Sequence, residues 1–247
     1  MPFDPHVFRH MPHLRDLITP PDRSEMRFGQ DRLEAYDAQA REEGWAPGWR
    51  MACEDREANR RSVLAGRPDE DLWVFGYGSL IWDPAVYVDE YRMATLEGWR
   101  RSFCMRLESG RGSRERPGLM AALDAGGRCE GVVMRIPAAL VERETEFMWR
   151  REMFGGAYRP IFQKVVTPQG DVDALVFVIE PLNHRYSPDL PEDRAARMIA
   201  VAEGSLGPNF DYLDNLVSHL CALGVRDEAM IRLRDSALRY RGDGQTA

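Results

Sequence analysis

Short apolar segments separated by turn residues fill the chain between residues 72 and 180. The segment 72–75, Leu-Trp-Val-Phe, ends at Gly76 and predicts a buried strand. Further strands are expected at 92–97, 100–107, 119–123, 129–136, 158–167 and 172–180. Hairpin turns are expected at Gly126-Gly127 and at Gln169-Gly170-Asp171. Because short turns join most of these strands, the pattern favours a mainly antiparallel sheet or barrel over a doubly wound parallel sheet.

Helices interrupt and follow the strands, so the predicted fold class is α+β. One helix is expected over 138–153, directly after Pro137, because proline suits the first turn of a helix. The remaining helices are expected from Pro191, from Pro208 to Gly224, and over 226–238. These elements predict a main domain at residues 71–240.

Residues 1–70 differ from the rest because they are polar, rich in arginine and interrupted by prolines. Two helices are expected there, near 30–43 and 53–65, and each is followed by a glycine that suits a helix C-terminus. We interpret this region as an extension that is packed on, or tethered to, the main domain.

Charge and hydropathy exclude several classes of partner. The chain of 247 residues carries 33 Lys+Arg against 40 Asp+Glu, a net charge of -7 that disfavours a nucleic-acid binder. The longest strongly apolar run, 174–179, is far shorter than the roughly 20 residues that a membrane helix needs. No basic segment followed by an apolar stretch begins the chain, so the expected location is the cytoplasm. No oligomeric state is predicted.

Cysteine and histidine positions predict neither a metal site nor a disulfide framework. The four cysteines, Cys53, Cys104, Cys129 and Cys221, form no C-x-x-C pair, and reduced thiols are expected. His6, His10 and His13 would cluster on a helix, but Pro12 interrupts it, so a solvated tail is favoured over metal binding.

A glycine-rich loop follows the first strand, with the sequence Phe-Gly-Tyr-Gly-Ser-Leu-Ile-Trp-Asp-Pro over 75–84. Successive backbone N–H groups in such a loop form a concave site for a carboxylate or a developing oxyanion, although a plain tight turn is the alternative. Ile81 occupies the third glycine position of a dinucleotide-binding fingerprint, which excludes that motif. The residues around Ser79 likewise do not form the G-x-S-x-G elbow of a serine hydrolase.

A carboxylate at the end of the 138–153 helix is the second signal. Val141, Met148 and Glu152 fall on one side of the helix, so Glu152 continues an apolar stripe. Partial desolvation there would raise the pKa of its carboxyl towards the range of an acid–base catalyst, unless Arg150 or Arg151 pairs with it. The alternative interpretation is a solvated glutamate at a helix end.

These two segments together resemble the ChaC family of γ-glutamylcyclotransferases. The resemblance covers roughly residues 72–235 and rests on motifs in the following order and spacing: Phe75-Gly76-Tyr77-Gly78-Ser79-Leu80-Ile81-Trp82, Gly98-Trp99-Arg100-Arg101-Ser102-Phe103, Arg116-Pro117-Gly118-Leu119, Cys129-Glu130-Gly131-Val132, Arg151-Glu152-x-x-Gly155-Gly156-x-Tyr158, Gly207-x-Asn209-x-Asp211-Tyr212-Leu213 and His219-Leu220-x-x-Leu223-Gly224. It implies a small, mainly antiparallel β-barrel with peripheral helices, and cleavage of glutathione to 5-oxoproline and cysteinylglycine without a cofactor or metal.

The resemblance also implies the site residues. It assigns proton transfer to Glu152 and substrate binding to the following residues: Gly76, Tyr77, Gly78, Ser79, Leu80, Ile81 and Tyr158. Glutathione is then the expected small-molecule partner. Two alternatives stay open: a cyclotransferase for other γ-glutamyl amines or peptides, and a non-enzymatic, metabolite-binding regulator linked to cation transport.

Overall fold

The computed structural model describes residues 3–67 and 69–243, which fall into two compact units. Unit 1 comprises 1–95 and 132–178, and unit 2 comprises 96–131 and 179–247. Each unit is therefore discontinuous in sequence, and two long strands run from one into the other. Among the described residues, every helix is too short or too polar to cross a lipid bilayer.

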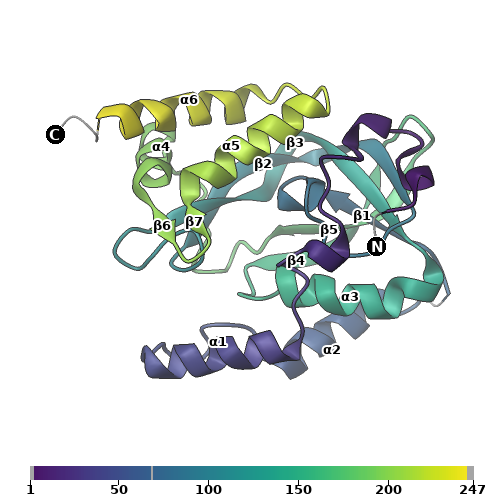
Figure 1. The fold of residues 1–247 in the computed structure, drawn as a ribbon, viewed down its shortest axis with the longest axis horizontal. Coiled ribbons are helices and arrows are strands. Elements are labelled where there is room, and N and C mark those ends of the chain that lie inside the picture. The colour runs from purple at the N-terminus through teal and green to yellow at the C-terminus, as the bar shows by residue number, and fades with distance from the viewer. Residues whose placement is uncertain (1–2, 68, 244–247) are drawn as a thin grey trace. The chain divides into compact units, whose positions relative to one another are not determined.

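A curled five-stranded sheet contains the strands of unit 1 (Figure 1). Its strands, in spatial order, are β2 (Glu90–Leu107), β3 (Gly118–Ile136), β1 (Leu72–Gly76), β5 (Val172–Ile179) and β4 (Tyr158–Val165). Strand β1 pairs antiparallel with β3, with Val74 opposite Met134, and parallel with β5, with Val74 opposite Leu175. The α+β class is confirmed, and the parallel pair is a feature that the sequence did not predict.

Strands β2 and β3 correct part of the sequence prediction. The segments 92–97 and 100–107 belong to one strand, and so do 119–123 and 129–136. The predicted hairpin turn at Gly126-Gly127 is therefore wrong. Both glycines have a left-handed backbone, with φ of +92° and +75°, yet the strand continues through them, as at a bulge. The turn at 169–171 is confirmed, because Gly170, with φ of +107°, lies between the neighbouring strands β4 and β5.

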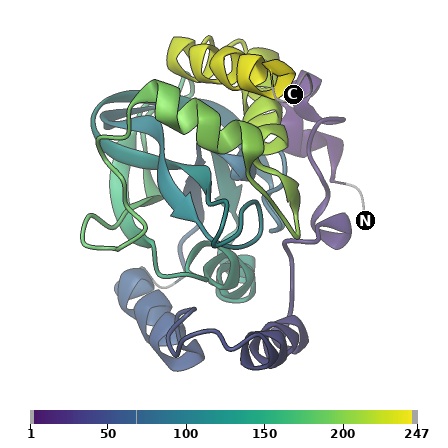
Figure 2. The same cartoon turned by 90° about the vertical axis from the view of Figure 1, so that its left-hand side faces the viewer.

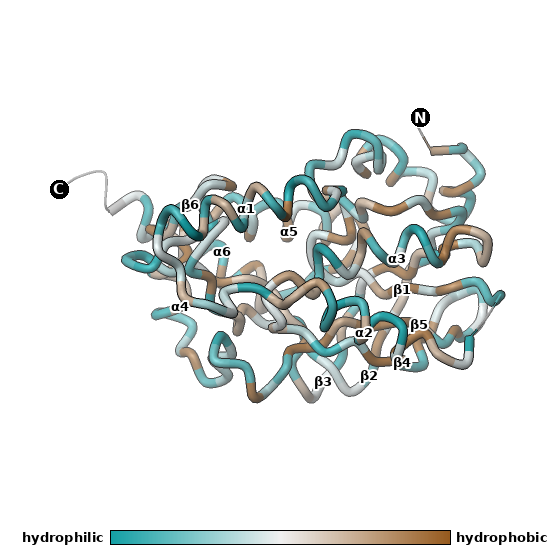
Figure 3. The backbone as a smooth tube through the Cα atoms, turned by 90° about the horizontal axis from the view of Figure 1, so that it is seen from below, coloured by the Kyte–Doolittle hydropathy of each residue, from teal (hydrophilic) through white to brown (hydrophobic). Residues whose placement is uncertain are grey.

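Three α-helices of unit 1 lie on one side of the sheet: α1 (Gln30–Glu42), α2 (Cys53–Leu64) and α3 (Ala138–Glu152). Figures 1 and 2 show α3 between the sheet and the pair α1 and α2. The predicted helix after Pro137 is confirmed, and its apolar face packs on the sheet through Trp149, whose ring lies 5.3 Å from that of Phe177. Hydrophobic residues follow the strands in Figure 3, whereas α1 and α2 are mostly hydrophilic.

The N-terminal segment is part of unit 1 and packs against its other residues. It begins with three short 3-10 turns, at Pro5–Phe8, Pro12–Leu14 and Pro21–Arg23. Phe8, Met11 and Leu14 are each only 1% exposed, and the Phe8 ring stacks on Tyr91 at 5.3 Å. These side chains contribute to the core that carries the central sheet.

Unit 2 contains the outer parts of β2 and β3 and the C-terminal elements. These elements are α4 (Glu192–Val201), β6 (Glu203–Gly204), β7 (Gly207–Pro208), α5 (Asn209–Ala222) and α6 (Glu228–Asp243). The fully buried Asn209 accepts a hydrogen bond from the Leu119 N–H at 2.8 Å and donates to the Leu119 carbonyl at 2.7 Å. One side-chain amide therefore ties the start of α5 to β3 as a strand partner would.

Candidate functional site

The glycine-rich loop follows β1 and turns through a short 3-10 segment, η4 (Ser79–Ile81). At the start of the loop, Gly76 has no side chain, which allows the Met134 and Leu80 side chains to lie close to its backbone. A Cβ there would lie 3.1 Å from the Met134 methyl and 3.3 Å from the Leu80 Cβ, closer than side chains normally pack. The start of the loop is therefore packed tightly against side chains of β3.

Apolar side chains of the loop anchor it in the core. Leu80 and Ile81 are 4% and 1% exposed, and the Tyr77 hydroxyl donates a hydrogen bond of 2.9 Å to the Phe177 carbonyl. These three side chains are used for packing, and the Ile81 N–H donates a hydrogen bond of 2.9 Å to the Gly78 carbonyl. Binding of substrate by Gly76 to Ile81 stays a prediction.

Glu152 is the last residue of α3, and its side chain is only 11% exposed. It follows the buried Met148 along the same face of the helix, as the apolar stripe predicted. Burial raises the pKa of the Glu152 carboxyl, and nearby Asp83 raises it further, while Arg151 acts in the opposite direction. The direction of this shift is the one that a carboxyl needs in order to act as a general acid–base group.

Arg151 joins the loop to the carboxylate, a role that the sequence did not predict. Its side chain is 4% exposed; it donates to the Ser79 Oγ at 2.7 Å and to the Asp83 carbonyl, and its Nε lies 2.8 Å from the Glu152 Oε1. Arg150 instead donates to Glu146, at 3.2 Å. Of the two arginines considered for pairing with Glu152, Arg151 is the one that does so.

The charges around Arg151 do not balance. Its guanidinium contacts Glu152 and also lies 4.0 Å from the Asp83 Oδ1. That oxygen is buried and accepts no hydrogen bond from the described residues. Two carboxylates thus share one guanidinium, which leaves the cluster able to attract a cationic group such as an ammonium.

Tyr158 begins β4, beyond the turn that ends α3, and is 9% exposed. Gly156 in that turn has φ of +63°, a left-handed conformation that favours glycine after a helix. The turn brings the chain from Glu152 to Tyr158 within a few residues. The contact of Tyr158 with substrate stays a prediction.

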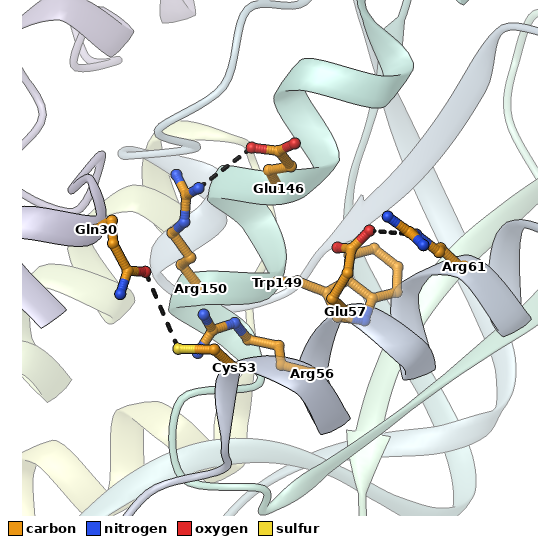
Figure 4. A pocket seen from close by; sticks show the side chains of 8 residues that line it. All are labelled: Gln30, Cys53, Arg56, Glu57, Arg61, Glu146, Trp149 and Arg150. Atoms are coloured by element: carbon orange, nitrogen blue, oxygen red, sulfur yellow. Dashed lines mark hydrogen bonds and ion pairs between the residues drawn. The ribbon is translucent and has the colours of Figure 1, made fainter.

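A cavity of about 320 Å³ lies elsewhere in unit 1, between α2 and α3 beside the start of α1 (Figure 4). Its lining includes neither Glu152 nor the glycine-rich loop, so this cavity is separate from the cluster around Arg151. Eight residues line this cavity: Gln30, Cys53, Arg56, Glu57, Arg61, Glu146, Trp149 and Arg150. Within the described part of the chain, no group of three or more His, Cys, Asp or Glu side chains is placed to hold a metal ion.

Arg151→Gln should lower kcat/KM by about 10- to 100-fold, because each lost charged hydrogen bond is worth about 1.5–3 kcal/mol. Loss of the guanidinium also raises the pKa of Glu152 further, so the acidic limb of the pH–rate profile should move to higher pH. Arg150→Gln is the matched control, since Arg150 bonds to Glu146. Equal profiles for the two variants would contradict a positioning role for Arg151.

Comparisons with known proteins place these motifs in one family. A family model described as ChaC-like protein matches residues 72–240. The glutathione-specific gamma-glutamylcyclotransferase of Escherichia coli K12 is 42% identical over 181 residues, which cover 72% of this chain and 78% of that protein. The human glutathione-specific gamma-glutamylcyclotransferase 1 is 30% identical over 172 residues, covering 67% and 78%.

A solved structure agrees with this at the level of the fold. The crystal structure of a yeast γ-glutamyl cyclotransferase specific to glutathione matches with a TM-score of 0.64 at 21% identity, over 69% of this chain and 97% of that one.

Proposed function

The chain belongs to the ChaC-like family, and from this premise we propose that it is a glutathione-specific γ-glutamylcyclotransferase. The observation that carries the proposal is the buried Glu152 carboxylate, linked through Arg151 to Ser79 of the glycine-rich loop. Two of the motifs on which the family resemblance rested, the glycine-rich loop at 75–82 and the helix end at 151–158, supply the residues of this cluster.

The reaction closes a five-membered lactam. The α-amine of the γ-glutamyl residue attacks its own γ-carbonyl carbon, a C–N bond forms, and the bond to the cysteinyl nitrogen breaks. Because the attack is intramolecular, the protein contributes chiefly by fixing one substrate conformer. The products are 5-oxoproline and cysteinylglycine.

Proton transfer is the task of Glu152. The substrate amine is largely protonated at neutral pH, so a base must remove a proton before it attacks, and the leaving cysteinyl amine must gain one. One carboxylate whose pKa is raised by burial takes the first proton and donates the second. The excess negative charge that Glu152 and Asp83 share around Arg151 also attracts the incoming ammonium.

The glycine-rich loop offers hydrogen-bond donors, in contrast to the negative charge of Glu152 and Asp83. Backbone N–H groups over 77–80 hold the substrate α-carboxylate or the tetrahedral oxyanion, with the loop fixed by its buried side chains. Tyr158 contacts the substrate from the start of β4. The hydrogen bond from Tyr77 to the Phe177 carbonyl and the one from Arg151 to Ser79 hold the loop in place. Electrostatic stabilisation of this kind needs such a preorganised geometry.

The alternatives are less well supported. A regulator that only bound an acidic metabolite would gain nothing from a carboxylate at the site, because Glu152 would repel the ligand. A cyclotransferase for other γ-glutamyl amines would share the whole cluster. Comparing the turnover of glutathione with that of γ-glutamyl-alanine separates that alternative from the main proposal.

Product identification tests the mechanism. Glutathione should give 5-oxoproline, whereas glutathione acetylated on its glutamyl nitrogen should give no product, because an amide nitrogen is a very weak nucleophile. S-Methyl glutathione is the control, since its sulfur takes no part in ring closure. Mass analysis of a reaction run in ¹⁸O-labelled water decides between the mechanisms. Labelled glutamate would indicate hydrolysis and refute the proposal, and unlabelled 5-oxoproline would support it.

Further features belong to the same proposal and stay predictions from the sequence. They are closure of the sheet into a small barrel, a boundary between an extension at 1–70 and a catalytic domain at 71–240, function without a cofactor, the absence of a nucleic-acid partner, and a cytoplasmic location.

A further inference from the structure

Cys53 opens onto the cavity beside α2 and differs from the other cysteines in its surroundings. It is the first residue of α2 and only partly buried, and it lines the hollow of about 320 Å³ together with the residues drawn in Figure 4. That volume lies at the lower end of the range for small-molecule sites, about 300–1,000 Å³. A ligand seated there would contact the sulfur directly.

Arg56 supplies an unbalanced positive charge to the cavity. Its side chain is buried, at 6% exposure, and its Nη1 makes no hydrogen bond within the described residues. The other two arginines of the lining are already paired, Arg61 with Glu57 at 2.7 Å and Arg150 with Glu146 at 3.2 Å. Arg56 is therefore the cation that an anionic group entering the cavity would meet.

Three features favour the thiolate form of Cys53. The thiol stands at the positive end of α2, the Arg50 guanidinium donates to it at 3.7 Å, and Arg56 lies beside it in Figure 4. Partial burial works to raise the pKa of this thiol, but the hydrogen bonds from Arg50 and Arg56 outweigh it and hold the pKa below its usual value.

The other thiols lack this combination. Burial raises the pKa of both Cys104 and Cys129 to about 11, and Cys221 is an exposed residue on α5. Reactive cysteines are typically partly exposed and next to cations, as Cys53 is. Cys221 can serve as an internal reference for an ordinary surface thiol.

We propose that Cys53 is a modification site that forms a mixed disulfide with a small acidic thiol of the glutathione type, and that Arg56 holds a carboxylate of the incoming group. The Cys53 thiolate attacks one sulfur of the acidic disulfide, a new S–S bond forms, and the original S–S bond breaks. The departing sulfur takes the electron pair and a proton from water. The Cys53 sulfur is oxidised and one half of the reagent is reduced to a free thiol, so the disulfide is the only oxidant required.

The test uses the reduced full-length protein, glutathione disulfide as the acidic probe and cystamine as a cationic probe. Peptide mass mapping follows the two probes at each cysteine, so the readout is independent of the reaction at Glu152. With glutathione disulfide, Cys53 should react about tenfold or more faster than Cys221, in line with the effect of local charge on association. With cystamine this advantage should be much smaller.

Variants assign the preference to the cavity. Arg56→Gln should remove the preference of Cys53 for the acidic probe, whereas Arg61→Gln, which alters an already paired cation of the same lining, should keep it. Arg56→Lys retains the charge and should keep the preference. If wild-type Cys53 reacts no faster than Cys221, or reacts equally with both probes, the proposal is wrong, and this comparison needs no variant.

Discussion

Replacing Glu152 by glutamine should lower kcat by about 10²–10⁴-fold, the contribution typical of a general acid–base group. Glutamine keeps the shape of the side chain and can still bond to Arg151, but it can neither accept nor return the proton. Steady-state formation of 5-oxoproline measures the loss. A variant that retains more than about a tenth of the wild-type kcat would exclude Glu152 as the proton-transfer group.

The same variant should not lose stability. Because burial raises the pKa of Glu152, the folded state favours the protonated form, and keeping the group ionised at neutral pH opposes folding. Removing the charge should therefore leave the free energy of unfolding at pH 7 unchanged or increase it. Glu146→Gln is the matched control, since Glu146 lies on α3 with its side chain 44% exposed and should affect neither activity nor stability.

The sequence predicts those parts of the candidate site that depend on local pattern. The apolar stripe ending at Glu152 and the glycines after β1 are visible in short windows, and the structure places both as expected. Arg151 was missed as the connecting residue for two reasons. Its bond to Ser79 spans 72 positions, and adjacent residues on a helix do not normally face each other.

For the fold as well, the sequence predicts local features better than long-range ones. Helices bounded by proline and glycine, such as α3, match their predicted limits closely. Gly126 and Gly127 misled the strand prediction, because a left-handed glycine pair within a bulged strand has the same local sequence as a hairpin turn. The parallel pairing of β1 with β5 joins residues about a hundred positions apart, for which no local periodicity exists.

Arg27→Met should destabilise the protein by up to about 3–5 kcal/mol, the penalty for breaking a buried ion pair, since only the largely exposed Arg143 and the Tyr87 N–H would still bond to the Glu144 carboxylate. Arg27 approaches the Glu144 carboxylate with both terminal nitrogens, at 2.5 and 3.1 Å, and the Glu144 side chain is completely buried. Arg27 also donates at 2.8 Å to the carbonyl of Ala85, a non-glycine residue with φ of +59°. The variant therefore also loses a restraint on a strained segment just beyond the glycine-rich loop.

Denaturant unfolding at pH 7 measures the loss of stability in Arg27→Met. Two further variants help to identify its cause. Arg61→Met removes an exposed pair, with the Arg61 side chain 75% exposed, and should change stability by only about 0–1 kcal/mol. Adding Glu144→Gln to Arg27→Met removes the buried charge as well and should recover part of the lost stability. A double variant no more stable than Arg27→Met would indicate that lost packing, and not the loss of a charge partner for the Glu144 carboxylate, causes the destabilisation.

The pH dependence of stability tests independently whether the charge of Glu144 causes the destabilisation of Arg27→Met. Burial works to raise the pKa of Glu144, but hydrogen bonds from Arg27, the Tyr87 N–H and Arg143 outweigh it and hold the pKa below its usual value. In the wild type this group therefore adds stability above its unfolded pKa, about 4.3, that is lost as the pH falls through its folded pKa. Without Arg27, burial has the larger influence on the pKa of Glu144, so this pKa rises. Protonation of Glu144 then removes the buried charge and reduces the destabilisation of the variant. The stability difference between wild type and Arg27→Met should accordingly narrow on acidification, and a difference that stayed constant between neutral pH and about pH 4 would contradict the charge-based explanation.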